Sequence, residues 1–139
     1  MDYCTIQNML DRFSEEELIQ LTDTGDVGIV DQAVLQSAID DASAFIDGYL
    51  QSRYQLPLTE VPRSLVRVAC NIVRYFLYDD AATERVQADY DGAVAYLKSV
   101  SKGEVVLGAS TTGVKPTVAE SAEVITQATV FNRNEGGFI

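Results

Sequence analysis

The chain has 139 residues, of which 47% are hydrophobic, and this is enough for one domain with its own apolar core. The formal net charge is −11, and the first 52 residues carry 11 acidic residues and one basic residue. Such acidity excludes tight wrapping of nucleic acid by an isolated subunit, because phosphate binding needs a positive surface.

The N-terminal part predicts two short helices followed by an acidic loop. Ile6–Leu10 has the spacing of the first helix. Ser14 is placed as the N-cap of the second helix, and Glu17 three residues later completes a capping box. The loop from Asp23 to Asp31 favours a turn in which Asp31 caps the next helix. The alternative is a calcium loop, although its twelfth position is a valine where calcium loops have a glutamate.

A long helix is predicted from about Gln32 to Ser52. Its apolar residues recur at helical spacing and form one stripe: Leu35, Ala38, Ile39, Ala42, Phe45, Ile46, Tyr49 and Leu50. Asp40, Asp41 and Asp47 fall largely off this stripe. Charge of this kind is more typical of a solvated or subunit-contacting face than of acid–base chemistry.

The segment Val61–Asp80 is the most apolar helical pattern of the chain. It follows a connector whose prolines prevent a helix, and Pro62 suits a first helical turn. Apolar residues cover most of its circumference: Leu65, Val66, Val68, Ala69, Ile72, Val73, Tyr75, Phe76 and Leu77. Such a helix must be surrounded by others, so we predict that it is the central helix. Arg63, Arg67 and Arg74 lie on the remaining strip, which faces a partner or the acidic part of this chain.

The last long helix is predicted to begin after Thr83 as N-cap and to end at Gly103. Glu104–Gly108 is a short β-like run. From residue 109 the chain is small and polar, with too little apolar area to offset its own ordering entropy. This segment is either a flexible tail or an arm that orders on a partner, with these anchoring side chains: Val130, Phe131, Phe138 and Ile139.

No catalytic or cofactor site is predicted. The chain has no histidine, which removes the commonest general base and metal ligand. Cys4 and Cys70 are far apart in the sequence and resemble neither a disulfide framework nor a zinc site. We expect no signal peptide and no membrane span, and synthesis in a reducing cytoplasm. For the arginine strip we favour salt links, either with the acidic helix at 31–50 or with a neighbouring subunit. The alternative is phosphate binding, which needs broader positive charge.

Three stretches resemble the neck-region proteins of Mu-like phages and prophages: Arg12–Asp23, Ile46–Leu58 and Ala69–Asp80. That family is similar in helical plan to the head–tail connector (adaptor) proteins of tailed phages. The resemblance covers residues 3–108, and Ile46–Leu58 is its most specific part. It implies a structural protein of the virion neck, assembled in the cytoplasm of the host bacterium.

The resemblance also implies the partners. The subunit would form a ring, a dodecamer, that docks beneath the portal, extends the DNA channel and receives the tail through a stopper or tail-terminator protein. DNA would pass through an acidic lumen without specific binding. The resemblance implies that an arm contacts the portal through Val130, Phe131, Arg133, Phe138 and Ile139. The predicted subunit interface contains these residues: Arg53, Arg63, Arg67, Arg74, Asp40, Asp41 and Asp47.

We therefore predict an all-α fold, a small bundle of three long helices and one or two short N-terminal helices around a central apolar helix. Residues 1–108 form the helical connector domain, and residues 109–139 form an extended C-terminal arm. The alternative function is a small acidic regulatory or inhibitory module that binds a basic protein. A third hypothesis, an acid-dependent hydrolase, has no supporting constellation of residues.

Overall fold

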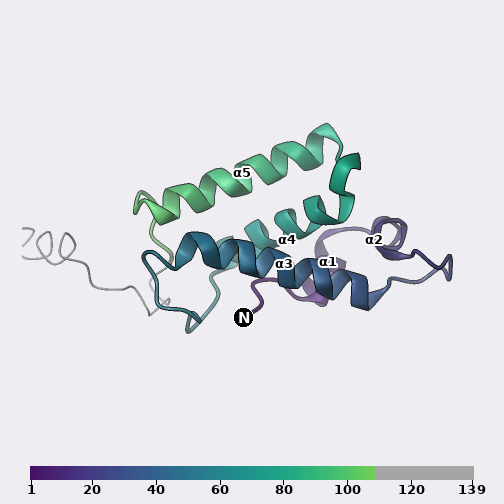
Figure 1. The fold of residues 1–139 in the computed structure, drawn as a ribbon, viewed down its shortest axis with the longest axis horizontal. Helices are drawn as coiled ribbons and strands as arrows, with labels where there is room; N and C mark the ends of the chain where they lie inside the picture. Colours follow the sequence, from purple (N-terminus) through teal and green to yellow (C-terminus); the bar gives the residue numbers. More distant parts are fainter. Residues whose placement is uncertain (109–139) are drawn as a thin grey trace, which may run out of the picture.

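A computed structural model of the chain describes residues 1–108, which form a helical body (Figure 1). Its elements are α1 (Ile6–Arg12), α2 (Glu15–Thr22), α3 (Gln32–Leu50), α4 (Arg63–Tyr78), a 3-10 helix η1 (Asp79–Ala81) and α5 (Glu84–Ser101). Residues 1–108 contain no strand, so the predicted all-α fold with three long and two short helices is confirmed. The predicted C-terminal arm lies outside the described residues, and the division into two domains stays a prediction.

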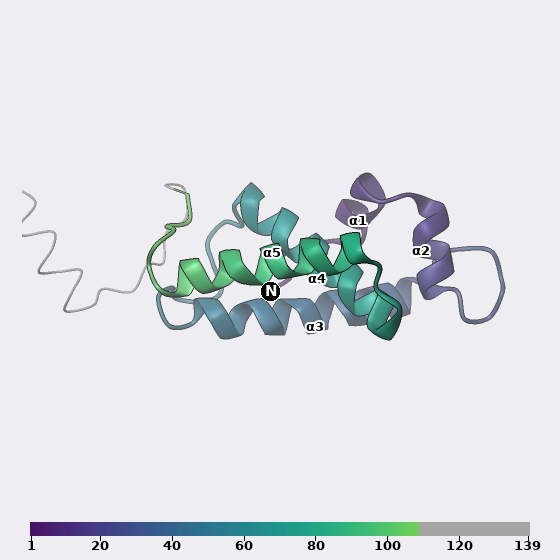
Figure 2. The ribbon, with the colours of Figure 1, turned by 90° about the horizontal axis from the view of Figure 1, so that it is seen from above.

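Helix α4 lies at the centre of the body, as its sequence predicts. It packs against each of the other four α-helices, and Leu65, Ile72 and Val73 are completely buried. Helices α3 and α5 run along the long axis, while α2 and the acidic loop lie at one end (Figures 1 and 2). The apolar arc is less fully covered at the C-terminal end of α4, where Phe76 and Leu77 are only partly buried.

Polar side chains begin the long helices where the sequence predicts. Asp31 Oδ1 accepts hydrogen bonds from the N–H groups of Ala33 and Val34, at 3.0 and 3.3 Å. Thr83 Oγ1 accepts from the N–H of Val86 at 3.2 Å. These contacts satisfy backbone donors that have no partner inside a helix. Pro62 differs slightly from expectation, since it is the N-cap of α4 and not part of the first turn.

The predicted capping box at α2 is only half formed. Ser14 Oγ accepts from the N–H of Glu17 at 3.1 Å, but the Glu17 side chain is turned toward α4. A full capping box occurs instead at α1. Thr5 Oγ1 accepts from the N–H of Asn8, and Asn8 Oδ1 accepts from the N–H of Thr5. Glu17 binds side chains on α4 because α2 packs directly against that helix.

The predicted β-like run Glu104–Gly108 is not a strand. The N–H groups of Glu104 and Val105 donate back to the carbonyl of Ser99, at 2.9 and 3.3 Å. The N–H of Leu107 donates to the Tyr54 hydroxyl at 2.9 Å, and the Leu107 side chain is buried. The run has no neighbouring strand in this helical body, so it folds onto the end of α5 and the connector. Within residues 1–108, no helix combines the length and apolarity needed to cross a membrane.

Candidate functional site

Four arginines from three helices line one open hollow of about 520 Å³, which we call the arginine hollow. Arg12 ends α1, Arg67 and Arg74 come from α4, and Arg85 lies in the first turn of α5. The other lining residues are Phe13, Ser14, Glu17, Asn71 and Asp89. The hollow thus gathers four of the chain's ten basic residues on a molecule with a net charge of −11.

Arg74 is fixed inside the subunit by several contacts. Its Nε donates to Glu17 Oε2 at 2.9 Å, and its Nη1 lies 3.9 Å from Asp89 Oδ2. The guanidinium also lies over the Phe13 ring, 4.7 Å from the centroid, in a cation–π contact. The Tyr78 hydroxyl donates to the same Glu17 oxygen at 2.6 Å, and this hydrogen bond, followed by burial, raises the pKa of Tyr78. Arg74 therefore holds α1, α2, α4 and α5 together beneath the hollow.

Arg12 and Arg67 carry the charge that is open to a partner. Both are exposed, and neither forms an ion pair within residues 1–108. Arg85 is bound to Asp89 one helical turn away, at 3.4 Å. Arg67 also borders an adjoining hollow of about 330 Å³ between α4 and α5, beside Tyr96. An acidic surface placed over these hollows would meet two unpaired guanidinium groups.

The structure brings together only part of the predicted arginine strip. Arg67 and Arg74 share the arginine hollow, whereas Arg63 is exposed near the start of α4 and does not line it. Arg53 follows the C-terminal end of α3 and packs against Gly103, where an added Cβ would lie 2.8 Å from Arg53 Cζ. The proposed salt link with the acidic helix at 31–50 is not made by Arg74, whose partners lie on α2 and α5.

The three predicted interface acids of α3 differ in their surroundings. Asp40 and Asp41 are exposed, and Asp40 accepts a hydrogen bond from Gln36 Nε2 at 3.0 Å. Asp47 instead accepts a hydrogen bond from the hydroxyl of the buried Tyr3. Burial and this hydrogen bond both raise the pKa of Tyr3. Asp47 therefore anchors the N-terminal segment to α3, which leaves Asp40 and Asp41 as the acids open to a partner.

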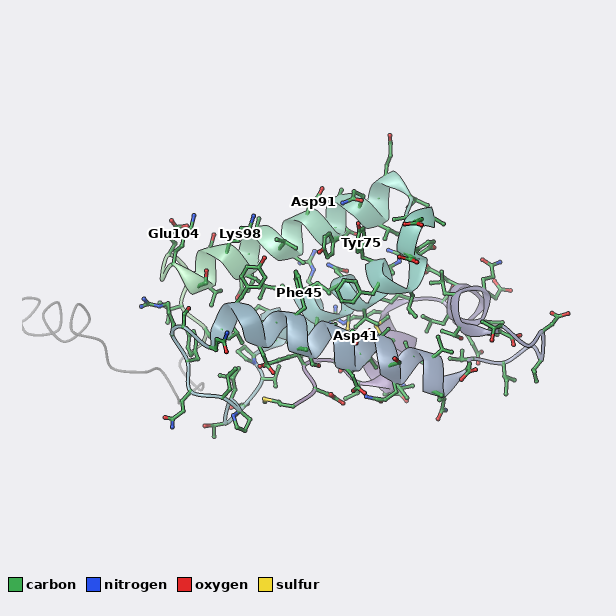
Figure 3. The ribbon with its side chains drawn as sticks, in the orientation of Figure 1. Asp41, Phe45, Tyr75, Asp91, Lys98 and Glu104 are labelled. Carbon is green, nitrogen blue, oxygen red and sulfur yellow. The ribbon has the colours of Figure 1, made fainter. Side chains whose placement is uncertain are left out.

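A second surface of interest is a groove between α3 and α5, lined by the partly buried rings of Phe45, Tyr49 and Tyr90, which continue inward to the aromatic side chains of α4. Phe45 lies 5.9 Å from Phe76 and 5.4 Å from Tyr49, measured between ring centroids. Tyr75 stacks on Tyr90 with centroids 3.8 Å apart (Figure 3, where Phe45 and Tyr75 are labelled). Aromatic side chains are enriched in protein–protein interfaces, so this groove, with its partly buried rings, is a second candidate contact surface.

The acidic loop uses its first carboxylate internally. Asp23 accepts hydrogen bonds from the N–H groups of Val27 and Gly28, at 3.0 and 2.6 Å. These backbone contacts lower the pKa of Asp23. No group of three or more cysteine, aspartate or glutamate side chains within residues 1–108 is arranged to hold a metal ion. The geometry gives the calcium alternative no positive support.

Sequence reasoning missed much of the arginine hollow. Arg12 and Arg85 lie at helix ends far apart in the chain, and no periodic pattern connects them with Arg67. Glu17 was assigned to a cap, and its contact with Arg74 spans 57 residues. The one available signal was the presence of arginines near helix ends in an otherwise acidic chain.

Comparison with known proteins identifies the family that this chain resembles. The family described as "Bacteriophage Mu, Gp36" matches residues 3–126. "Gene product J" of Escherichia phage Mu is 38% identical over 142 residues, which covers 100% of both chains. "Mu-like prophage FluMu protein gp36" of Haemophilus influenzae is 34% identical over 138 residues, covering 99% of this chain and 98% of that relative.

Proposed function

Because this chain belongs to the Bacteriophage Mu Gp36 family, we propose that it is a structural virion protein, a head–tail connector subunit of a Mu-like phage. In this proposal, copies of the chain form a dodecameric ring beneath the portal, as the resemblance to adaptor proteins implies. The ring extends the DNA channel and gives the tail, through a stopper or tail-terminator protein, a surface to dock on.

A closed ring needs two unlike surfaces on each subunit, because each copy binds the next through a head-to-tail contact. The arginine hollow supplies a basic surface, and Asp40 with Asp41 on α3 supplies an acidic one. The hollow is lined by residues of α1, α4 and α5 and by residues at the start of α2, whereas Asp40 and Asp41 lie on α3, which contributes no residue to it. We propose that Arg12 and Arg67 of one subunit face Asp40 and Asp41 of the next.

The observation that carries this proposal is that Arg12 and Arg67 are exposed and form no ion pair with any other residue in the described part of the chain, residues 1–108. Arg74, two helical turns from Arg67 on the same face of α4, shows that the same subunit neutralises an arginine when an acid is within reach. The two remaining guanidinium groups match the excess acid of a second copy. Electrostatic matching of this kind fixes the register of an interface and disfavours wrong partners.

The charge distribution also suits a channel for DNA. Most of the net charge of −11 comes from the first 52 residues, which carry 11 acids. If part of this acidity lines the lumen, it repels the phosphate backbone, and DNA slides through without specific binding. Placing the arginine hollow at the seam between subunits keeps its positive charge away from the passing DNA.

The arm at residues 109–139 is proposed to bind the portal through Val130, Phe131, Arg133, Phe138 and Ile139. Four of these five side chains are apolar, and they include Phe131 and Phe138, the two aromatic residues of the segment. The family match extends to residue 126, so the first half of the segment shares the common sequence of the family. We expect a chain cut to residues 1–108 to keep its helical circular dichroism but lose portal binding. Unchanged portal affinity would refute the role of the arm while leaving the ring contact intact.

A charge exchange tests the ring contact. Arg67→Glu or Asp41→Arg alone should abolish assembly, measured by native mass spectrometry with and without the portal protein. The double variant should recover it, because the two charges then exchange places across each seam. Arg63→Glu is the matched control, since Arg63 is exposed on the same helix but lies outside the hollow. If Arg67→Glu assembled as wild type does, the proposed contact would be refuted. If the wild-type chain stayed a monomer and bound a basic protein, the alternative function, an acidic regulatory or inhibitory module, would be favoured.

A further inference from the structure

The two cysteines meet in the core although 66 positions separate them in the sequence. The Sγ atoms of Cys4 and Cys70 lie 3.1 Å apart, and both residues are free thiols. Their exposed fractions are 1% and 0%. Cys4 precedes the N-cap of α1 and Cys70 lies in the middle of α4, so the contact joins the N-terminal segment to the central helix.

The surroundings hold the two sulfur atoms in this arrangement. Tyr3, the residue before Cys4, is buried and donates its hydroxyl hydrogen bond to Asp47 on α3. Thr5, the residue after Cys4, is held by the capping box of α1. A disulfide has an S–S distance of about 2.05 Å, so the two sulfur atoms need to approach by only about 1 Å.

The electrostatic environment gives the two thiols different roles. A hydrogen bond from the Cys4 thiol lowers the pKa of Cys70, and the Arg12 guanidinium acts in the same direction. The pKa of Cys4 is raised, first by its hydrogen bond with Cys70 and then by burial. Cys70 is therefore the sulfur that ionises first, and a thiolate is the form that reacts with oxidants.

We propose that Cys4 and Cys70 are an oxidative modification site, at which a hydroperoxide converts the pair into an intrachain disulfide. In the first step the Cys70 thiolate attacks one oxygen of hydrogen peroxide, the O–O bond breaks, and a sulfenic acid forms on Cys70. The departing hydroxide takes up the proton that Cys70 lost on ionising and leaves as water. In the second step Cys4 sulfur attacks the sulfenic sulfur, and the hydroxyl group leaves with the Cys4 proton as a second water. Two thiols are oxidised and one hydrogen peroxide is reduced. This inference does not depend on the proposed connector function.

The cross-link closes a loop that contains α1, α2 and α3. Tying the ends of a long loop restricts the unfolded chain far more than the folded one. The oxidised protein should therefore melt roughly 10 °C higher than the reduced protein, and dithiothreitol should reverse the change. Oxidation requires the buried pair to open briefly, so Tyr3→Phe, which removes the anchor on Asp47, should react faster than wild type.

The experiment treats the purified full chain with hydrogen peroxide. The proposal predicts a loss of about 2 Da in intact mass, the disappearance of both thiols titrated in denaturant, and a reversible rise in melting temperature. Cys4→Ser and Cys70→Ser are the controls and should show neither the mass loss nor the rise. Three results would overturn the proposal: two thiols that persist after treatment, disulfide-linked dimers in place of the intrachain product, or a cross-linked chain that melts no higher.

Discussion

Replacing Glu17 by alanine tests whether the contacts beneath the arginine hollow hold α2 on the body. The substitution removes the acceptor for two hydrogen bonds, one from Arg74 Nε at 2.9 Å and one from the Tyr78 hydroxyl at 2.6 Å. A hydrogen bond to a charged group contributes about 1.5–3 kcal/mol. The side chains of Arg74 and Glu17 remain 20% and 16% exposed, and Asp89 stays near Arg74, so the sum must be discounted. We expect Glu17→Ala to lower the free energy of unfolding by ~2 kcal/mol.

The assay is thermal and urea denaturation followed by circular dichroism. A loss of ~2 kcal/mol corresponds to a fall in melting temperature of about 8 °C for a chain of this size. Glu16→Ala is the matched control, because Glu16 is exposed in the same helical turn and should change stability by less than ~0.5 kcal/mol. In a double-mutant cycle with Tyr78→Phe, the two changes should be non-additive by ~1 kcal/mol. Equal effects of Glu17→Ala and Glu16→Ala would refute this account of the contact.

Three further experiments probe the core, the N-terminal anchor and the backbone. Ile72→Asp should abolish the cooperative melting transition because it buries an unpaired charge, whereas the exposed Arg63→Asp should melt nearly as wild type. The raised pKa of Tyr3 means that this residue adds stability that is complete below about pH 10 and declines as the pH rises further. Tyr3→Phe should therefore unfold at a lower urea concentration than wild type at about pH 7. Between about pH 10 and pH 12, however, the variant should lose less stability than wild type. Gly48→Ala should raise the free energy of unfolding by ~0.5–1 kcal/mol, because an added Cβ in α3 meets only open space. Gly103→Ala should lower it by ~1–2 kcal/mol, because Gly103 has φ +80° and its Cβ would meet Arg53. The reverse order of melting temperatures would contradict this.

The sequence predicts the helices well because their signals are local. Asp31 and Thr83 act as N-caps within three residues of their partners, and both were identified from residue type and position. The central position of α4 follows from apolar residues over most of its circumference, and the burial of Ile72 confirms it. In each case the information lies within one helix, where spacing alone decides which residues share a face.

The site was harder to predict because its contacts join distant parts of the chain. Glu17 was assigned to a local capping box, but packing of α2 on α4 offers it a charged partner, and the ion pair forms instead. Asp47 was assigned to an interface, and the buried Tyr3 hydroxyl binds it within the subunit. Cys4 and Cys70 were dismissed for their separation in sequence, which says nothing about their separation in space. Such pairings depend on how the helices pack, and a single sequence does not encode that in any local pattern.

Electron microscopy of the full-length protein mixed with the portal protein of its own phage tests the connector proposal most directly. The proposal predicts a ring of this chain coaxial with the portal, in which the arginine hollow of each subunit faces α3 of the next. A protein that stays monomeric and leaves the portal bare at micromolar concentrations would contradict the proposal, whatever the stability of its helical body.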